Sequence, residues 1–80
     1  MISKKEEHNS TKIKFQHGDV DWYRPNIYYE EILVIAGYDP TDVLSVICTY
    51  PEHKGRAPAR GDTVVVRKGM RIEIAYTVNA

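Results

Sequence analysis

The sequence predicts an α+β domain in which a mixed β-sheet is covered by one helix, with the element order β-β-α-β-β-β. Two observations support this class. Short runs of alternating polar and apolar residues, separated by turns that contain Gly or Pro, follow one another through most of the chain, as half-buried strands do. Only one segment carries the start and stop signals of a helix. The 80 residues have room for one small domain, expected over residues 11–78 between a flexible leader at 1–10 and a tail end at 79–80.

The first two strands are expected to form a hairpin. Residues 11–17 alternate between polar and apolar, with two large apolar side chains facing the core, and residues 20–24 alternate again. Gly18 and Asp19 between the two runs are typical turn residues. Pro25 ends the second strand because it has no N–H to donate to a ladder.

The helix is predicted at residues 28–36. Glu30 and Glu31 suit its first turn, because the N-terminal end of a helix favours negative charge, and Gly37 suits the left-handed residue just past its end. Apolar residues at spacings of three and four give the segment one buried face. Two β-branched residues near its end make a strand the alternative, but the flanking residues favour a helix.

Three further strands are expected after the helix. Residues 43–50 are the most β-prone part of the chain, and residues 51–61 form a long loop because they contain four Pro and Gly residues. Residues 62–67 and 70–78 are the last two strands, joined by a turn. Alternation divides the side chains of these strands into an inward set of Leu44, Val46, Cys48, Ile72, Ile74 and Tyr76 and an outward set of Ser45, Ile47 and Thr49.

The charge of the chain is balanced but unevenly placed. Eleven Lys and Arg offset 11 Asp and Glu, which argues against an obligate nucleic-acid binder. Residues 19–52 nevertheless hold seven acidic residues and one Arg, whereas residues 54–71 hold six basic residues and one Asp. The sequence has no apolar run long enough for a membrane helix and no apolar signal core, so a cytoplasmic protein without membrane contact is expected.

Catalytic or metal-binding chemistry is not expected. His8, His17 and His53 lack the spacing of a metal site, and Cys48 on an inward strand face is expected to be a small core residue rather than a nucleophile. A single Cys also excludes an internal disulfide. Adjacent glutamates in the predicted helix point in different directions and are interpreted as solvated residues rather than an acid/base pair. No enzymatic activity, bound cofactor or metal is therefore predicted.

Six basic residues near the C-terminus form a candidate surface: Lys54, Arg56, Arg60, Arg67, Lys68 and Arg71. Three interpretations stay open, in decreasing order of preference. They are a solvated face, a docking surface for an acidic partner protein, and a single-stranded nucleic-acid site with Tyr50 and Tyr76 as stacking platforms. Ile47 is expected on the open side of the sheet, either as an isolated exposed residue or as an apolar contact for a partner.

Three stretches, in the same order, resemble the bacterial multiubiquitin-type domains, a ubiquitin-like group with the β-grasp fold. Residues 26–37, N-I-Y-Y-E-E-I-L-V-I-A-G, are similar to their helix pattern I-S/T-Y-E-x-L/I-x-x-L/I-A-G. Residues 44–50 and the basic loop after them resemble the central strand. Residues 60–72 resemble the closing pattern P-G-D/E-x-V-x-V/L-x-x-G-M-x-F/I, so the likeness covers about residues 12–78.

The resemblance implies a ubiquitin-like β-grasp fold and a protein modifier. An E1-like adenylyltransferase of the ThiF family would use ATP to activate the C-terminal carboxylate, and an E2-like protein would then carry the chain to a target or to another copy. A JAB-type peptidase is a further implied partner, and some such systems act in phage defence. By this likeness Ala80 would be the reacting terminus, Thr77, Val78 and Asn79 the threaded tail, and Ile47 with the six basic residues the partner-binding surface.

Two departures from the family pattern bear on these expectations. Tyr28 replaces the usual Ser or Thr at the helix N-cap, which predicts a weak cap. The sequence ends in Ala80 without a Gly-Gly pair. This second departure leaves a non-conjugated β-grasp interaction module as the alternative function, and a sulfur carrier as a weaker one.

Overall fold

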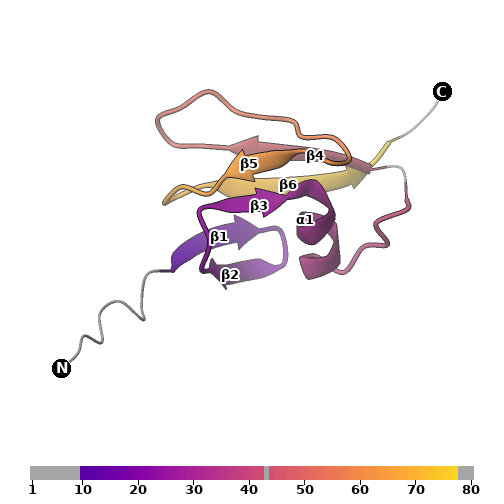
Figure 1. The fold of residues 1–80 in the computed structure, drawn as a ribbon, viewed down its shortest axis with the longest axis horizontal. Helices are drawn as coiled ribbons and strands as arrows, with labels where there is room; N and C mark the ends of the chain where they lie inside the picture. Colours follow the sequence, from indigo (N-terminus) through magenta and orange to yellow (C-terminus); the bar gives the residue numbers. More distant parts are fainter. Residues whose placement is uncertain (1–9, 43, 78–80) are drawn as a thin grey trace.

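A computed structural model describes residues 10–42 and 44–77, and in this part of the chain a four-stranded mixed sheet is combined with one short helix (Figure 1). The predicted α+β class is confirmed. The elements in chain order are β1 Thr11–Phe15, β2 Gly18–Trp22, β3 Asn26–Tyr28, α1 Tyr29–Ile35, β4 Leu44–Thr49, β5 Thr63–Val65 and β6 Arg71–Tyr76.

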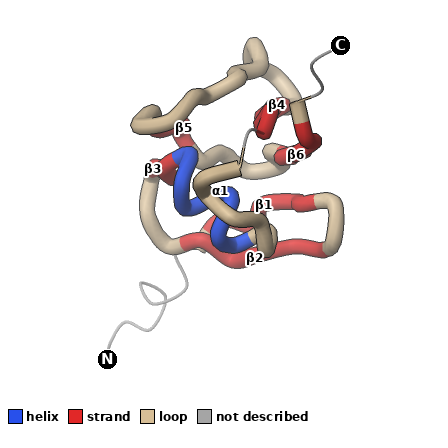
Figure 2. The backbone as a smooth tube through the Cα atoms, turned by 90° about the vertical axis from the view of Figure 1, so that its right-hand side faces the viewer, coloured by secondary structure: helices blue, strands red, loops and turns tan. Residues whose placement is uncertain are grey.

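The strand order of the sheet is β2-β1-β6-β4. The last strand, β6, therefore lies in the interior of the sheet, parallel to β1 and antiparallel to β4. Figure 2 shows that the sheet curves around α1, which occupies its concave side. A mixed sheet with parallel β1 and β6 around a single helix is consistent with a β-grasp-like topology.

The hairpin turn lies two residues earlier than the sequence predicts. Phe15 pairs with Gly18, so Gln16 and His17 form the turn and Gly18 begins β2. Gly18 has a φ of 149°, a conformation that only glycine adopts readily. The glycine thus follows the turn instead of forming it, and the prediction that Gly18 and Asp19 make the turn is wrong.

An additional strand, β3, precedes the helix and was not predicted. It pairs antiparallel with β5 in a separate two-stranded sheet, with Ile27 opposite Val64 and both side chains buried. A strand of three residues is too short to show alternation in the sequence. The predicted strand at 62–67 is correspondingly shortened to β5, and Val43 and Val78, at the ends of two other predicted strands, lie outside the described residues.

The helix forms where it was expected, and the strand alternative is wrong for most of this segment. Its N-cap, Tyr28, makes no side-chain cap, as the replacement of Ser or Thr predicts. The Glu31 carboxylate instead accepts a hydrogen bond from the Tyr28 backbone N–H at 2.9 Å. Gly37 follows the helix with a φ of 88°, the left-handed conformation predicted for it.

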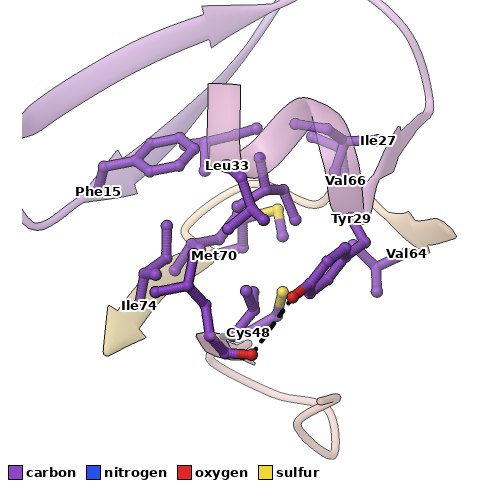
Figure 3. Close-up of a cluster of buried hydrophobic side chains, with 14 of the residues drawn as sticks. Phe15, Ile27, Tyr29, Leu33, Cys48, Val64, Val66, Met70 and Ile74 are labelled. Carbon is purple, nitrogen blue, oxygen red and sulfur yellow. Dashed lines mark hydrogen bonds between the residues drawn. The ribbon is translucent and has the colours of Figure 1, made fainter. Parts of the chain in front are cut away.

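The core lies between α1 and the concave side of the sheet (Figure 3). Ile32 and Leu33 of the helix have no exposed surface, and Met70 and Cys48 from the opposite wall are equally buried. Each large aliphatic side chain contributes about 1.5–3 kcal/mol when fully buried. The predicted inward set of β4 and β6 is confirmed except for Tyr76, which is 60% exposed because β6 ends there beyond the cover of the helix.

Candidate functional site

The convex side of the sheet is open, and its exposed side chains form the first candidate surface. Each strand of the sheet contributes to this open face, with Ser45, Ile47 and Thr49 from β4, Arg71, Glu73 and Ala75 from β6, Lys12 and Lys14 from β1, and Asp19 and Asp21 from β2. The predicted outward orientation of the three β4 residues is confirmed.

One pair of opposite charges on the open face forms an ion pair across strands, and a second pair lies in register. Lys12 Nζ lies 3.1 Å from the Asp21 carboxylate, and Lys14 is opposite Asp19 on β2 and next to Arg71 on β6. The Lys12–Asp21 pair is more than half exposed and is worth little stability. The part of the open face formed by β1 and β2 is therefore nearly neutral. Arg71 is the basic residue that β6 adds to this face.

Ile47 is the large apolar residue of this open face. Half of its surface is exposed, and its cross-strand neighbour is Glu73. The flanking residues on the same strand, Ser45 and Thr49, are polar. An apolar side chain surrounded by polar ones can act as a contact point for a partner, although single exposed apolar residues are also common on protein surfaces.

The six predicted basic residues are all exposed, but they do not form one patch. Arg67 and Lys68 line a hollow of about 330 Å³ together with Pro51, Glu52 and His53. Arg60 lines a different hollow beside β4, and Arg56 lies against the edge of the same strand. Lys54 belongs to the loop between these places, and Arg71 points from the open face of the sheet.

The nucleic-acid interpretation loses one of its two stacking platforms. Tyr50 is 7% exposed, and its hydroxyl donates a hydrogen bond to the Val65 carbonyl at 2.6 Å. The guanidinium of Arg67 lies 6.0 Å from the centre of the Tyr50 ring, so the ring also contributes to a cation–π contact. The expectation that Tyr50 offers a free face to a base is therefore wrong, whereas Tyr76 is exposed.

The end of β6 is anchored to neighbouring segments. The ring of Tyr76 makes an edge-on contact with Tyr38, with ring centres 5.7 Å apart, and the hydroxyl of Thr77 lies 3.0 Å from that of Ser45. Thr77 is thus the one predicted tail residue whose position is described. Val78, Asn79 and Ala80 lie outside the described residues, as does the predicted leader up to residue 9.

Cys48 has the properties of a core residue. It is fully buried, and burial raises the pKa of its thiol to about 11, so the nucleophilic thiolate is scarcely populated at neutral pH. Among the described residues, no three His, Cys, Asp or Glu side chains lie close enough to hold a metal ion. Within the same part of the chain, no helix is long and apolar enough to cross a membrane.

The two helix glutamates were predicted to be solvated residues, but both make specific contacts with other parts of the chain. Glu31 forms an ion pair with Arg24, and the backbone N–H of Tyr28 lowers the pKa of the Glu31 carboxyl, helped by Arg24. Glu30 accepts a hydrogen bond from the Gly61 backbone N–H at 2.9 Å. The Glu31 contact with Tyr28 is local, since a glutamate three residues after the N-cap commonly bonds to the N-cap N–H. The Glu30 contact could not be read from the sequence, because Gly61 is 31 residues away and meets the helix only in the fold.

Comparisons of the chain with models of known protein families, with curated proteins and with solved structures give no match.

Proposed function

We propose that this chain is a ubiquitin-like protein modifier that is activated at its C-terminal carboxylate. The observation that supports the proposal is the β-grasp-like arrangement, in which β6 lies in the interior of the sheet and its end is fixed by the Tyr38–Tyr76 and Ser45–Thr77 contacts. A segment that follows Thr77 starts from a point that these contacts attach to a small folded domain. An activating enzyme that grips the body could then guide such a segment into its active site.

The proposed chemistry proceeds in three steps on partner enzymes. The C-terminal carboxylate, that of Ala80, attacks the α-phosphorus of ATP on an E1-like protein and releases pyrophosphate. A cysteine thiolate then displaces AMP to form a thioester, and transfer to an E2-like protein exchanges one thiol for another. Finally an amine of the target attacks the thioester, the thiol leaves, and an amide forms.

The role of this chain in the proposed reaction is recognition. Thr77, Val78 and Asn79 would be the threaded segment, and no side chain of the folded body would take part in bond making. Ile47 and Arg71 on the open face, with the more distant basic residues Lys54, Arg56, Arg60, Arg67 and Lys68, would supply the surface that partner enzymes grip.

A second candidate is an interaction module that is not conjugated. It is favoured by the exposed Ile47 on a polar face, which a binding partner could use without any reaction. In that case the open face is the functional surface and the residues after Thr77 have no chemical role.

One experiment separates the two candidates. The 80-residue chain is incubated with ATP, a ThiF-family E1-like adenylyltransferase and an E2-like protein, and intact mass spectrometry follows the products. The modifier proposal predicts an adenylate, then a thioester sensitive to thiols, then a stable linked product, all dependent on ATP. Versions shortened by one to three residues from Ala80 test which terminus reacts. If neither the 80-residue chain nor any shortened version reacts, while the partners still bind in pull-down assays, the interaction module is correct.

A further inference from the structure

A second apolar surface lies where helix α1 meets strand β2, on the side of the sheet that carries the helix (Figure 2). Trp22 at the end of β2 and Val34 and Ile35 at the end of α1 line a hollow of about 340 Å³. Glu30 and Glu31 from the first turn of the helix complete this α1–β2 hollow. Its volume falls at the lower end of the range of ligand sites, about 300–1,000 Å³, so it has room for side chains of a partner.

The apolar part of the α1–β2 hollow is accessible. Val34 is 61% exposed, more than any other residue of α1, and Trp22 and Ile35 are half-buried. Val34 follows Glu30 by four residues and Glu31 by three, so these side chains share one face of the helix. A β-branched residue lowers helix propensity, so helix stability does not account for Val34 at an exposed position. The apolar residue of the open face is isolated among polar ones, whereas Val34 belongs to an apolar surface built from two elements.

The Trp22 ring is held in place by its own neighbours. Its indole N–H donates a hydrogen bond to the Asn26 carbonyl at 2.9 Å, and the side chain packs against the core. The guanidinium of Arg24 lies 4.7 Å from the centre of the ring and pairs with the Glu31 carboxylate. The chain's own Arg24 thus shows that the ring and a neighbouring carboxylate together hold a cationic side chain. Because the ring is already fixed, a partner would lose little of its binding energy in ordering it.

The charged residues that line the hollow are both acidic. Glu31 is paired with Arg24, whereas Glu30 forms no ion pair among the described residues. One oxygen of Glu30 accepts the Gly61 N–H, which fixes the carboxylate without cancelling its charge. Arg60, next to Gly61, lines the hollow beside β4 instead. Apolar walls beside a fixed carboxylate select an apolar side chain accompanied by a Lys or Arg, and they disfavour phosphate groups and acidic peptides.

We propose that the α1–β2 hollow binds a basic segment of a partner protein. A large apolar side chain of this segment, such as Leu or Phe, would pack against Trp22 and Val34, and an adjacent Lys or Arg would pair with Glu30. The apolar contact supplies affinity because it removes exposed surface from water, and the carboxylate supplies specificity because it repels segments of the wrong charge. The inference does not depend on conjugation at the C-terminus, since peptide binding requires neither ATP nor an activating enzyme.

The experiment selects binders of the 80-residue chain from a phage-displayed library of random linear peptides, and fluorescence polarisation measures the affinity of synthetic copies. We expect the selected peptides to carry Lys or Arg next to a large apolar residue. Copies with Glu in place of each Lys or Arg should lose binding.

Val34→Lys tests the apolar contact and should weaken binding by about tenfold or more, because the new side chain removes the contact and repels the segment. The helix should be kept, since the parent side chain is exposed and the new Lys can pair with Glu30 four residues earlier. The matched control is Val65→Lys on β5, which makes the same change at an exposed position outside the hollow. Its affinity should stay within about twofold of that of the parent.

Glu30→Gln tests the charge separately. The amide oxygen still accepts the Gly61 N–H, so the fold is kept while the charge is lost. We expect the affinity to fall by about fivefold and to depend less on salt concentration. Glu73→Gln makes the same change on the open face and should alter the affinity by less than about twofold.

Trp22 gives a direct signal of binding, because it is the only Trp of the chain. A bound peptide that lacks Trp should shield the ring, so acrylamide should quench the fluorescence less in the complex than in the free protein. The proposal is overturned if the selected peptides are not basic, if quenching is unchanged, or if the control variants weaken binding as much as Val34→Lys and Glu30→Gln do. Tighter binding of acidic peptides or single-stranded oligonucleotides at this hollow would also overturn it. So would self-association of the free chain that Val34→Lys abolishes in analytical ultracentrifugation, because the occupant would then be a second copy.

Discussion

Glu30 on helix α1 accepts a hydrogen bond at 2.9 Å from the backbone N–H of Gly61, 31 residues later in the sequence. The adjacent Asp62 carbonyl bonds to the Tyr29 N–H, so two contacts fix the end of the long loop to the first turn of the helix. The middle of the same loop is fixed by the pairing of Arg56 with Cys48. A loop held at two points keeps a constant position beside β4, although it has almost no regular secondary structure of its own.

Removal of the Glu30 contact should loosen this loop. We expect Glu30→Ala to reduce the free energy of unfolding by about 0.5–1.5 kcal/mol, the usual net worth of one hydrogen bond. Amide exchange at Gly61 should accelerate in native conditions, as measured by NMR. Glu30→Gln is the control, because its amide oxygen can still accept the bond and should restore most of the protection at Gly61. Equal exchange rates in all three proteins would show that the contact does not hold the loop.

Gly69 is predicted to be the least replaceable of the turn glycines. It has a φ of 84°, and a Cβ at this position would lie 2.8 Å from Cγ of Pro51. Gly69→Ala therefore combines backbone strain with a steric clash, and should cost about 2–3 kcal/mol in urea denaturation. Gly37→Ala is the matched control, because Gly37 has a φ of 88° but no atom near the added Cβ, and should cost about 1 kcal/mol. A second change, Pro51→Ala, should recover part of the loss only in the Gly69 variant.

The buried thiol should make stability depend on alkaline pH. Burial raises the Cys48 pKa from 9.0 to about 11, so between these values the unfolded chain loses its thiol proton while the folded chain keeps it. Ionisation thus favours the unfolded state, and stability should fall as the pH rises from 9 toward 11, by up to about 2–3 kcal/mol from this group. Cys48→Ala, compared at each pH by urea denaturation, should show a shallower fall. The fall should not vanish, because burial also raises the pKa of Tyr50.

The folded protein should also protect Cys48 from alkylation. At neutral pH, iodoacetamide should react with the native protein far more slowly than with the urea-unfolded chain, since the thiol is both inaccessible and protonated. Mass spectrometry of the alkylated fraction over time measures both rates. Rapid modification of the native protein at neutral pH would mean that Cys48 is accessible and would reopen a role for it as a nucleophile.

Much of the fold was predictable because neighbouring residues carry the signal. The alternation of residues 44–49 specified the strand and both of its faces, and Glu31 and Gly37 marked the helix. The missed features depend on chain segments that meet only in the folded protein. Strand β3 exists because β5 pairs with it, and the hollow beside β4 exists because residues 57–60 of the distant loop form its other wall.

The pairing of Glu31 should make helix stability depend on acidic pH. Its pKa is lowered first by the Tyr28 backbone N–H and then by Arg24, so the ionised form is favoured in the folded state. The stabilisation is present above the ordinary pKa of 4.5 and is lost as the pH falls below it. Glu31→Gln should therefore be less stable than the parent at pH 7, and the difference should shrink toward pH 3. Arg24→Gln should have a smaller effect than Glu31→Gln, because the backbone contact remains; the reverse order would show that the ion pair dominates.

Ile47 provides the sharpest test of the open face. Half of its surface is exposed, so its replacement should leave the core intact, but the choice of residue matters because Glu73 is directly opposite on β6. Ile47→Asp would place two carboxylates face to face, at a cost of up to about 1 kcal/mol, whereas Ile47→Lys would form a cross-strand ion pair. If partners grip this apolar side chain, both variants should reduce E1-dependent thioester formation by about tenfold or more, with circular dichroism and unfolding temperature little changed for the Lys variant.

Val65→Lys on β5, where the parent residue is 41% exposed, is the matched control outside this face and should react at the parental rate. Loss of reaction in Ile47→Asp alone would indicate repulsion of an acidic partner surface, and full activity of both variants would remove Ile47 from the recognition surface.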